Sequence, residues 1–253
     1  MTNKKLRFYT YIGAVFVAAY ASLPGYINSS FLTTFISEDN IGWLYALASI
    51  VTIALMVITP KLINHWGNRQ VLLWLTVLSL FSIVPLAGPI FGYTPSIYLT
   101  LMAFGLYVIL GYLGRYTLDV YLENISDNKG TGLIRGIYMT FYNLAWLVSP
   151  FAAAYLVATS SYNLVYAIAG LILIPLLWIT IFKLKETGYN HCVGPKSSVW
   201  LSLENIWKRR IPEADNIRRI LIIDFLLNFF YAIMVVYMPL YLLNHIGLSW
   251  EEI

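Results

Sequence analysis

Residues Tyr162–Phe182 read YNLVYAIAGLILIPLLWITIF, a stretch without a single Asp, Glu, Lys or Arg. An α-helix needs about 20 consecutive apolar residues to cross the hydrocarbon core of a bilayer, and this stretch is long enough to do so. One buried helix of a soluble protein could look the same, so this stretch alone does not decide the fold. Its repetition along the chain does.

Further apolar runs of similar length follow one another with mostly short connections. They are Phe8–Phe35, Gly42–Leu62, Val71–Pro89, Ile97–Leu122, Leu133–Ala158 and Ile220–Leu243. Membrane-spanning strands would be only about ten residues long and would alternate in hydropathy, which these runs do not. The sequence therefore predicts an all-α, multi-pass membrane protein with about seven transmembrane helices.

The composition agrees with a lipid-facing surface. The chain is 59% hydrophobic and 11% charged, whereas soluble domains carry about 25% charged residues. The net charge of +4 could suggest nucleic acid, but the basic residues lie mostly in loops between apolar runs, so we expect the bilayer as the partner instead. The single cysteine, Cys192, excludes an internal disulfide and a multi-cysteine metal site.

Motifs for catalysis or nucleotide binding do not occur in the sequence. It contains no Gly-x-x-x-x-Gly-Lys-Ser/Thr loop, no His-Glu-x-x-His and no Gly-x-Ser-x-Gly. The three histidines, His65, His191 and His245, fall in different loops, which argues against a three-histidine metal site. We therefore expect no catalytic residues, no metal and no cofactor.

The basic residues predict the orientation in the membrane. Of the sixteen Lys and Arg residues, all but Arg115 precede the first run or fall in alternate connections: Lys4, Lys5 and Arg7, then Lys61 and Arg69, Lys129 and Arg135, and the remainder from Lys183 to Arg219. The other connections carry only the acids Glu38, Asp39, Glu251 and Glu252. The positive-inside rule places the N-terminus in the cytoplasm of a plasma or inner membrane.

Connection lengths divide the chain into three parts. We predict a six-helix bundle over residues 1–186, a cytoplasmic linker over 187–219, and the first helix of a second bundle over 220–253. If the helix after the linker begins a second copy of the six-helix unit, the chain holds part of a twelve-helix pattern. Within the linker, one helical face would carry the apolar residues Trp200, Leu203, Ile206 and Trp207. That face fits a short helix on the membrane surface, and a plain solvated linker fits equally.

Residues 60–69, PKLINHWGNR, resemble a motif of the major facilitator superfamily of secondary transporters, which reads Gly-x-Leu-Ala-Asp-Arg-x-Gly-Arg-Lys in the loop between helices 2 and 3. Leu62 and Gly67 match it, and Arg69 keeps the final positive charge. Pro60 replaces the first glycine and Asn64 the aspartate. A second resemblance lies in the fifth helix: Arg135-Gly136, then Asn143, Trp146 and Ser149-Pro150.

The resemblance implies two six-helix bundles joined by a cytoplasmic linker. It also implies transport of a small solute by alternating access, either driven by an ion gradient, with protons as one candidate, or facilitative. The motif implies a latch in which Arg69 pairs with Asp119 or Glu123. The missing aspartate at Asn64 should weaken the half of the latch that faces the second bundle.

Ionisable groups within the apolar runs need a reason, because each costs about 2.5–3.5 kcal/mol at the bilayer centre. Arg115 and Asp119 lie one helical turn apart and can pair, and Glu123 extends the same face. They either line the central cavity or its inner gate, or form a self-paired cluster near the headgroups. Asp224 is either a proton-coupling carboxylate or an interfacial acid satisfied by its neighbours.

Other polar and aromatic residues are candidates for lining the substrate path. Tyr26 and Asn28 follow Pro24-Gly25, where the first helix can kink. The alternative is a kink whose freed carbonyls are satisfied by Ser29 and Ser30. The remaining candidates, for which packing or interhelical hydrogen bonding is the alternative, are Tyr142, Asn143 and Asn228.

Other membrane-protein classes fit less well. Seven-helix receptors and retinal proteins place the N-terminus outside, and a retinal protein needs a lysine in its last helix, which Ile220–Leu243 lacks. A non-transporting membrane scaffold, or a half-transporter that must dimerise, stays open as the alternative to a transporter.

Overall fold

The computed structural model describes residues 3–126, 131–186, 204–208, 214–250 and 252, which form helices and turns without a strand. The longer helices are α1 (Asn3–Ser22), α3 (Glu38–Trp66), α4 (Asn68–Ala87), α5 (Ile97–Asn124), α6 (Thr131–Thr159), α7 (Tyr162–Phe182) and α9 (Ala214–Val236). The shorter ones are α2 (Asn28–Thr33), η1 (Gly88–Phe91), α10 (Met238–Leu240) and η2 (Tyr241–Ile246). The all-α, multi-pass prediction is therefore confirmed.

Six helices of the described part are long and apolar enough to cross a membrane, and α1 adds a further apolar helix. The predicted bounds Tyr162–Phe182 are those of α7. Two predictions differ from the structure. The first predicted helix is broken between α1 and α2, and the last begins at Ala214 rather than Ile220. Of the predicted surface helix, residues 204–207 are helical, and the rest lies outside the described residues.

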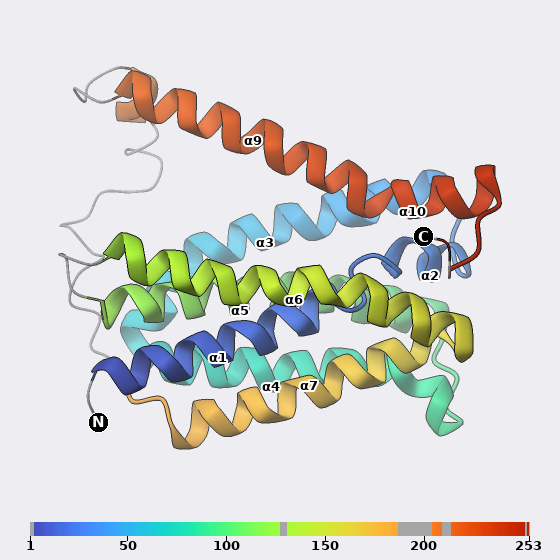
Figure 1. Ribbon diagram of the computed structural model, residues 1–253, viewed down its shortest axis with the longest axis horizontal. Coiled ribbons are helices and arrows are strands. Elements are labelled where there is room, and N and C mark those ends of the chain that lie inside the picture. Colours follow the sequence, from blue (N-terminus) through green and yellow to red (C-terminus); the bar gives the residue numbers. More distant parts are fainter. Residues whose placement is uncertain (1–2, 127–130, 187–203, 209–213, 251, 253) are drawn as a thin grey trace.

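Helix α1 lies at the centre of the bundle, where it packs against α5, α6 and α7. Helix α4 packs between α5 and α7, and α3 packs on the outer side of α5 (Figure 1). Ala14 and Ala18 of α1 are fully buried, and such small side chains let neighbouring helix backbones approach closely. Large apolar side chains point outward instead, as at Tyr98 and Phe151, which suits a surface covered by lipid.

The two ends of the bundle differ in charge. We call the end that carries the start of α1, the α3–α4 turn and the end of α7 the basic end, because Lys4, Arg69 and Lys183 lie there. The opposite end, with Glu38 and Glu252, is the acidic end. Helix α9 runs from the basic towards the acidic end, so the two chain termini lie at opposite ends of the molecule (Figure 1).

The break after α1 follows from Pro24 and Gly25. Proline has no backbone N–H to donate to the carbonyl of Tyr20, and the N–H of Gly25 turns to Ser22 O (3.0 Å) instead of Ala21 O. Both freed carbonyls accept hydrogen bonds from the Tyr107 hydroxyl of α5, at 3.4 Å for Tyr20 O and 2.9 Å for Ala21 O. A side chain of the neighbouring helix α5 thus satisfies the carbonyl groups that the kink leaves unpaired.

Candidate functional site

Two polar contacts join α5 to α6 towards the basic end. The Arg135 guanidinium donates to the Asp119 carboxylate at 2.8 Å. One turn earlier on α5, the Arg115 guanidinium carbon lies 4.5 Å from the centre of the Tyr142 ring. Both helices also pack on α1. The expected pairing of Arg115 with Asp119 is therefore wrong, because α6 supplies Arg135 as the partner of Asp119.

The Asp119 pair borders a small pocket at the basic end. Its walls are Asp119, Leu122, Glu123, Ser126, Ile134 and Arg135, and its volume is about 10 Å³. Asp119 Oδ2 holds Arg135, while Asp119 Oδ1 is buried and has no hydrogen-bond partner among the described residues. Glu123 is exposed at the rim. The charged pair thus contains a carboxylate with one oxygen bound to Arg135 and the other unsatisfied.

The turn between α3 and α4 depends on Gly67. Its φ of 88° lies in the left-handed region, which glycine adopts without steric cost. A Cβ at this position would also overlap the carboxylate of Glu186. The next residue, Asn68, is fully buried, and with its amide turned to satisfy both groups it donates to Thr117 O (3.2 Å) and accepts from Tyr121 N (2.9 Å). Residues 60–69 thus end in a tight turn at Gly67.

Arg69 binds the end of α7 and neither of its expected acceptors, Asp119 and Glu123. Its Nε donates to Thr180 O at 2.9 Å and its Nη2 to Ile181 O at 2.8 Å. The last carbonyls of a helix have no partner within the helix, and they attract positive charge. The latch prediction was therefore wrong about the partner of Arg69.

The segment that follows α7 is also hydrogen-bonded near the α3–α4 turn. Glu186 accepts a hydrogen bond from the backbone N–H of Arg69 at 3.2 Å. The hydroxyl of Tyr121 in α5 donates to Lys185 O (2.8 Å) and accepts from Lys185 N (3.1 Å). We call the set Gly67, Arg69, Tyr121, Lys185 and Glu186 the basic-end clamp. Sequence reasoning missed Tyr121 and Glu186, because no spacing links residues that lie so far apart in the chain.

At the acidic end, helix 7 (α9, α10 and η2) is docked on the bundle. Val236 and Leu240 are buried in the main hydrophobic core. The Asn244 amide donates to Glu38 at the start of α3. The Trp250 indole N–H donates to the Tyr162 hydroxyl at 3.2 Å, with the two rings edge to face. We call these interactions the acidic-end contacts.

A turn fixes the position of Trp250. The backbone N–H and the hydroxyl of Ser249 both donate to the Glu252 carboxylate, at 2.8 and 2.9 Å. These bonds, the backbone one first, lower the pKa of Glu252 from its ordinary value. Ser-x-x-Glu with these bonds resembles the start of a helix.

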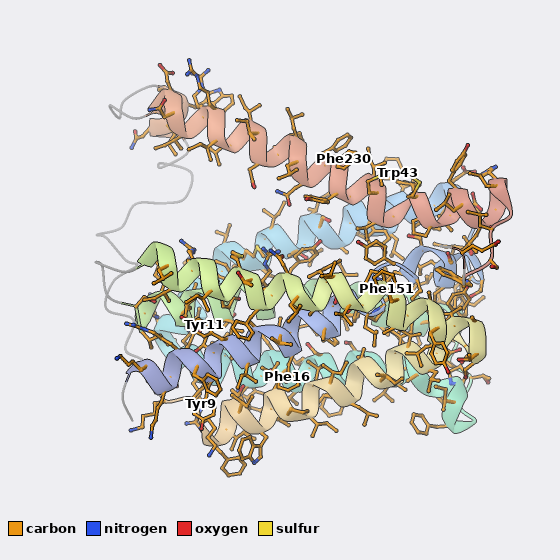
Figure 2. All side chains as sticks on the ribbon, viewed as in Figure 1. Tyr9, Tyr11, Phe16, Trp43, Phe151 and Phe230 are labelled. Carbon is orange, nitrogen blue, oxygen red and sulfur yellow. The ribbon has the colours of Figure 1, made fainter. Side chains whose placement is uncertain are left out.

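Towards the basic end, α9 diverges from α3 (Figure 1). Its side chains from Ile220 to Tyr231 are exposed, as Phe230 illustrates in Figure 2. Asp224 and Asn228 are among them, and the Asn228 amide donates to the backbone carbonyl of Asp224 at 2.8 Å. The predicted proton-coupling and path candidates of helix 7 are thus on an open helix and not in a packed site.

The helix 1 candidates occupy different surroundings. Asn28 is 5% exposed, and its side-chain oxygen accepts from the Tyr166 hydroxyl of α7 at 2.7 Å. Tyr26 is half-buried, with its ring edge to face with Trp146 of α6. The serine hydroxyls have no partner among the described residues, so Tyr107, and not Ser29 or Ser30, satisfies the kink. On α6, Asn143 is exposed.

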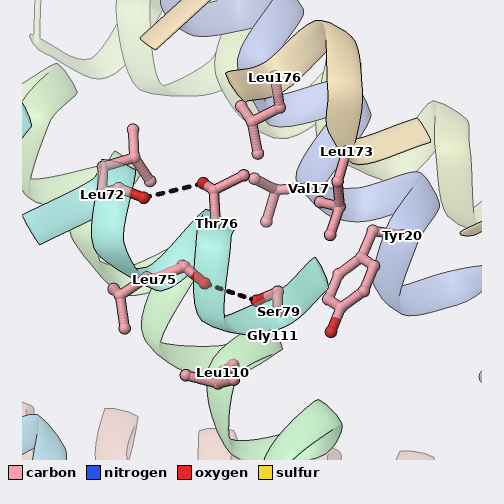
Figure 3. A pocket seen from close by; sticks show the side chains of 11 residues that line it. Val17, Tyr20, Leu72, Leu75, Thr76, Ser79, Leu110, Gly111, Leu173 and Leu176 are labelled. Carbon is pink, nitrogen blue, oxygen red and sulfur yellow. Dashed lines mark hydrogen bonds between the residues drawn. The ribbon is translucent and has the colours of Figure 1, made fainter. Parts of the chain in front are cut away.

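A small hollow lies between α1, α4, α5 and α7. It is lined by Val17, Tyr20, Leu173 and Leu176, among others, and has a volume of about 10 Å³ (Figure 3). Its hydroxyl groups are used within α4, where Thr76 donates to Leu72 O and Ser79 to Leu75 O, both at 2.8 Å. The space fits about one water molecule, so it is a packing defect and not a solute site.

Comparison with known proteins agrees with the fold. A family model described as Major Facilitator Superfamily matches residues 10–253. Among curated proteins, none matches the chain. The family match spans the bundle, the long connection and helix 7. The chain therefore belongs to the Major Facilitator Superfamily of membrane transporters.

Proposed function

We propose that this protein moves a small solute across the membrane as a secondary transporter by alternating access. In this proposal, residues 1–186 form the first bundle, 187–219 the cytoplasmic linker, whose residues 214–219 already belong to α9, and 220–253 the first helix of the second bundle. The N-terminus faces the cytoplasm, because the basic end carries the positive charge.

One observation carries the proposal. Helix 7 is held by the acidic-end contacts, through Asn244, Leu240 and Trp250, while α9 stays exposed along the half nearer the basic end. A transporter of this kind must close one side of its path while the other side opens. This arrangement supports the proposal of a state that is closed at the acidic end and open at the basic end.

In the proposed path, α1, α5, α6 and helix 7 surround the solute. Arg115, Asp119 and Tyr142 supply polar and aromatic groups from α5 and α6, and the pair of Asp119 with Arg135 acts as a gate at the basic end. Intramembrane charges commonly mark such pathways. Other path residues are Tyr26, Asn28, Asn143 and Asn228, and Asp119, Glu123 and Asp224 are the carboxylates available for proton coupling.

The proposal is tested by solute uptake into proteoliposomes that contain the full chain. Arg115→Ala should abolish uptake while the amount of protein inserted in the membrane stays unchanged, because the variant removes a path residue whose described contact is with the face of a single ring, that of Tyr142. Uptake equal to that of the wild type would remove Arg115 from the path. No uptake of any solute by the wild-type chain would favour the scaffold alternative.

A further inference from the structure

Arg115 differs from the other described arginines of the bundle in what accepts its N–H groups. Arg7 donates to Ile125 O at 3.1 and 3.0 Å, Arg69 to carbonyls at the end of α7, and Arg135 to Asp119. Arg115 has the face of the Tyr142 ring at 4.5 Å. In the described part of the chain, neither a carboxylate nor a carbonyl oxygen accepts from it.

A ring face satisfies only one side of a guanidinium. The five N–H donors lie in the plane of the group, at its edges. Stacking on Tyr142 therefore holds the plane in place and leaves the edges to bind something else. A planar, fixed guanidinium edge is the protein group best suited to hold a carboxylate through two parallel hydrogen bonds.

A second unused donor lies next to this arginine. Tyr138 stands one turn before Tyr142 on α6, and the two rings are stacked with centroids 6.5 Å apart. Tyr138 is 1% exposed, and its hydroxyl has no hydrogen-bond partner among the described residues. It lies within electrostatic range of both Arg115 and Asp119. A buried hydroxyl without a partner is destabilising, so an acceptor at this point would stabilise the site.

The neighbouring charges restrict what the acceptor can be. Asp119 lies one turn along α5 from Arg115, and it is held by Arg135. Asp119 repels any anion, and it repels a dianion about twice as strongly as a monoanion, so a single negative charge matches the one guanidinium of Arg115 best. Around it, the rings of Tyr142 and Tyr138, with Tyr112 nearby on α5, offer flat apolar surfaces for the rest of a molecule.

We infer that Arg115, stacked on Tyr142 and assisted by the Tyr138 hydroxyl, binds the carboxylate of an organic monoanion. This inference rests on the proposed transport function, since it names the class of substrate that the path accepts. Arg115 and Tyr138 donate to the two carboxylate oxygens, Tyr142 positions the guanidinium, and the tyrosine rings contact the apolar body of the substrate.

Two matched pairs of probes test the inference on the full chain in nanodiscs. Benzoate is compared with benzamide, and lactate with lactamide, because each amide has the shape of its acid without the charge. Binding is measured as thermal stabilisation over a range of concentrations. At least one carboxylate should bind about tenfold or more tightly than its amide, since a hydrogen bond to a charged group contributes about 1.5–3 kcal/mol.

Variants of the site assign the effect to its residues. Arg115→Gln should remove the preference for the acid over the amide. Arg115→Lys keeps the positive charge but loses the planar group that can form two parallel hydrogen bonds, so it should retain only part of the preference for the acid. Tyr138→Phe should weaken binding of the acid and leave the amide unchanged. Tyr98→Phe, on the exposed face of α5, is the control and should behave as the wild type.

The outcomes separate the inference from the proposed function. If neither carboxylate binds more tightly than its amide, or if Arg115→Gln keeps the preference, the inference is wrong. Uptake of an uncharged solute into proteoliposomes, together with that result, would leave the transport function standing. Conversely, carboxylate binding that requires Arg115 without uptake of any solute would support the subsite and contradict transport.

Discussion

At the scale of single residues, the family motif acts through backbone geometry more than through charge. Gly67 adopts a left-handed conformation, with φ 88°, beside the Glu186 carboxylate, so a side chain at this position would be strained and would displace that carboxylate. Leu62 and Gly67 keep the motif pattern, whereas Asn64 is exposed and Arg69 caps α7. The sequence could predict that Gly67 is needed in a tight turn. It could not predict Glu186 as its neighbour, because that contact depends on how α7 packs.

Gly67→Ala should lower the stability of the protein by about 1–3 kcal/mol, because the added Cβ meets a strained backbone and a carboxylate. The melting temperature of the detergent-solubilised protein measures the effect. Gly105→Ala is the matched control, since a Cβ there would meet nothing within 4 Å. Equal melting temperatures for the two variants would show that the turn at Gly67 is not constrained.

At the scale of helices, hydropathy predicted α7 over Tyr162–Phe182 and the existence of every long helix. The ends of the helices were harder to predict, because polar turns at a membrane surface continue a helix without apolar residues. Helix α3 extends from Glu38 to Trp66 beyond its apolar run for this reason. The ion-pair partner of Asp119 could not be predicted from the sequence either. Helical spacing shows that Arg115 and Asp119 can meet, but the packing of α6 brings Arg135 to Asp119 instead.

The break in helix 1 gives a prediction at this scale. Tyr107→Phe removes the hydroxyl that serves both Tyr20 O and Ala21 O, and we expect a loss of about 1 kcal/mol of stability. Hydrogen exchange of the Tyr20–Ile27 backbone should also become faster. Tyr98→Phe serves as control on the same helix, because Tyr98 is 82% exposed. Unchanged exchange in Tyr107→Phe would mean that the kink does not depend on α5.

At the scale of the whole molecule, charge and topology make a joint prediction about orientation. Cys192, the single cysteine, belongs to the predicted cytoplasmic linker. A membrane-impermeant maleimide should therefore label it only after cells are permeabilised. In a Cys192→Ser background, Asp39→Cys at the acidic end should react in intact cells. The opposite labelling pattern would reverse the proposed orientation.

The central claim is that helix 7 moves against the bundle, docked at one end and separate at the other. Spin labels in a Cys192→Ser background measure this by pulsed electron resonance. One pair, Trp66→Cys with Ile220→Cys, reports the basic end, and the other, Trp43→Cys with Tyr241→Cys, reports the acidic end. All four positions are exposed.

Two populations are expected in nanodiscs, and the transported solute should change their ratio. In one population, the two labels at the acidic end are close together and the two at the basic end are far apart, as in the structure. In the other population, the labels at the acidic end are farther apart and those at the basic end closer. Distances that stay fixed, or that increase and decrease together, would contradict alternating access in this protein.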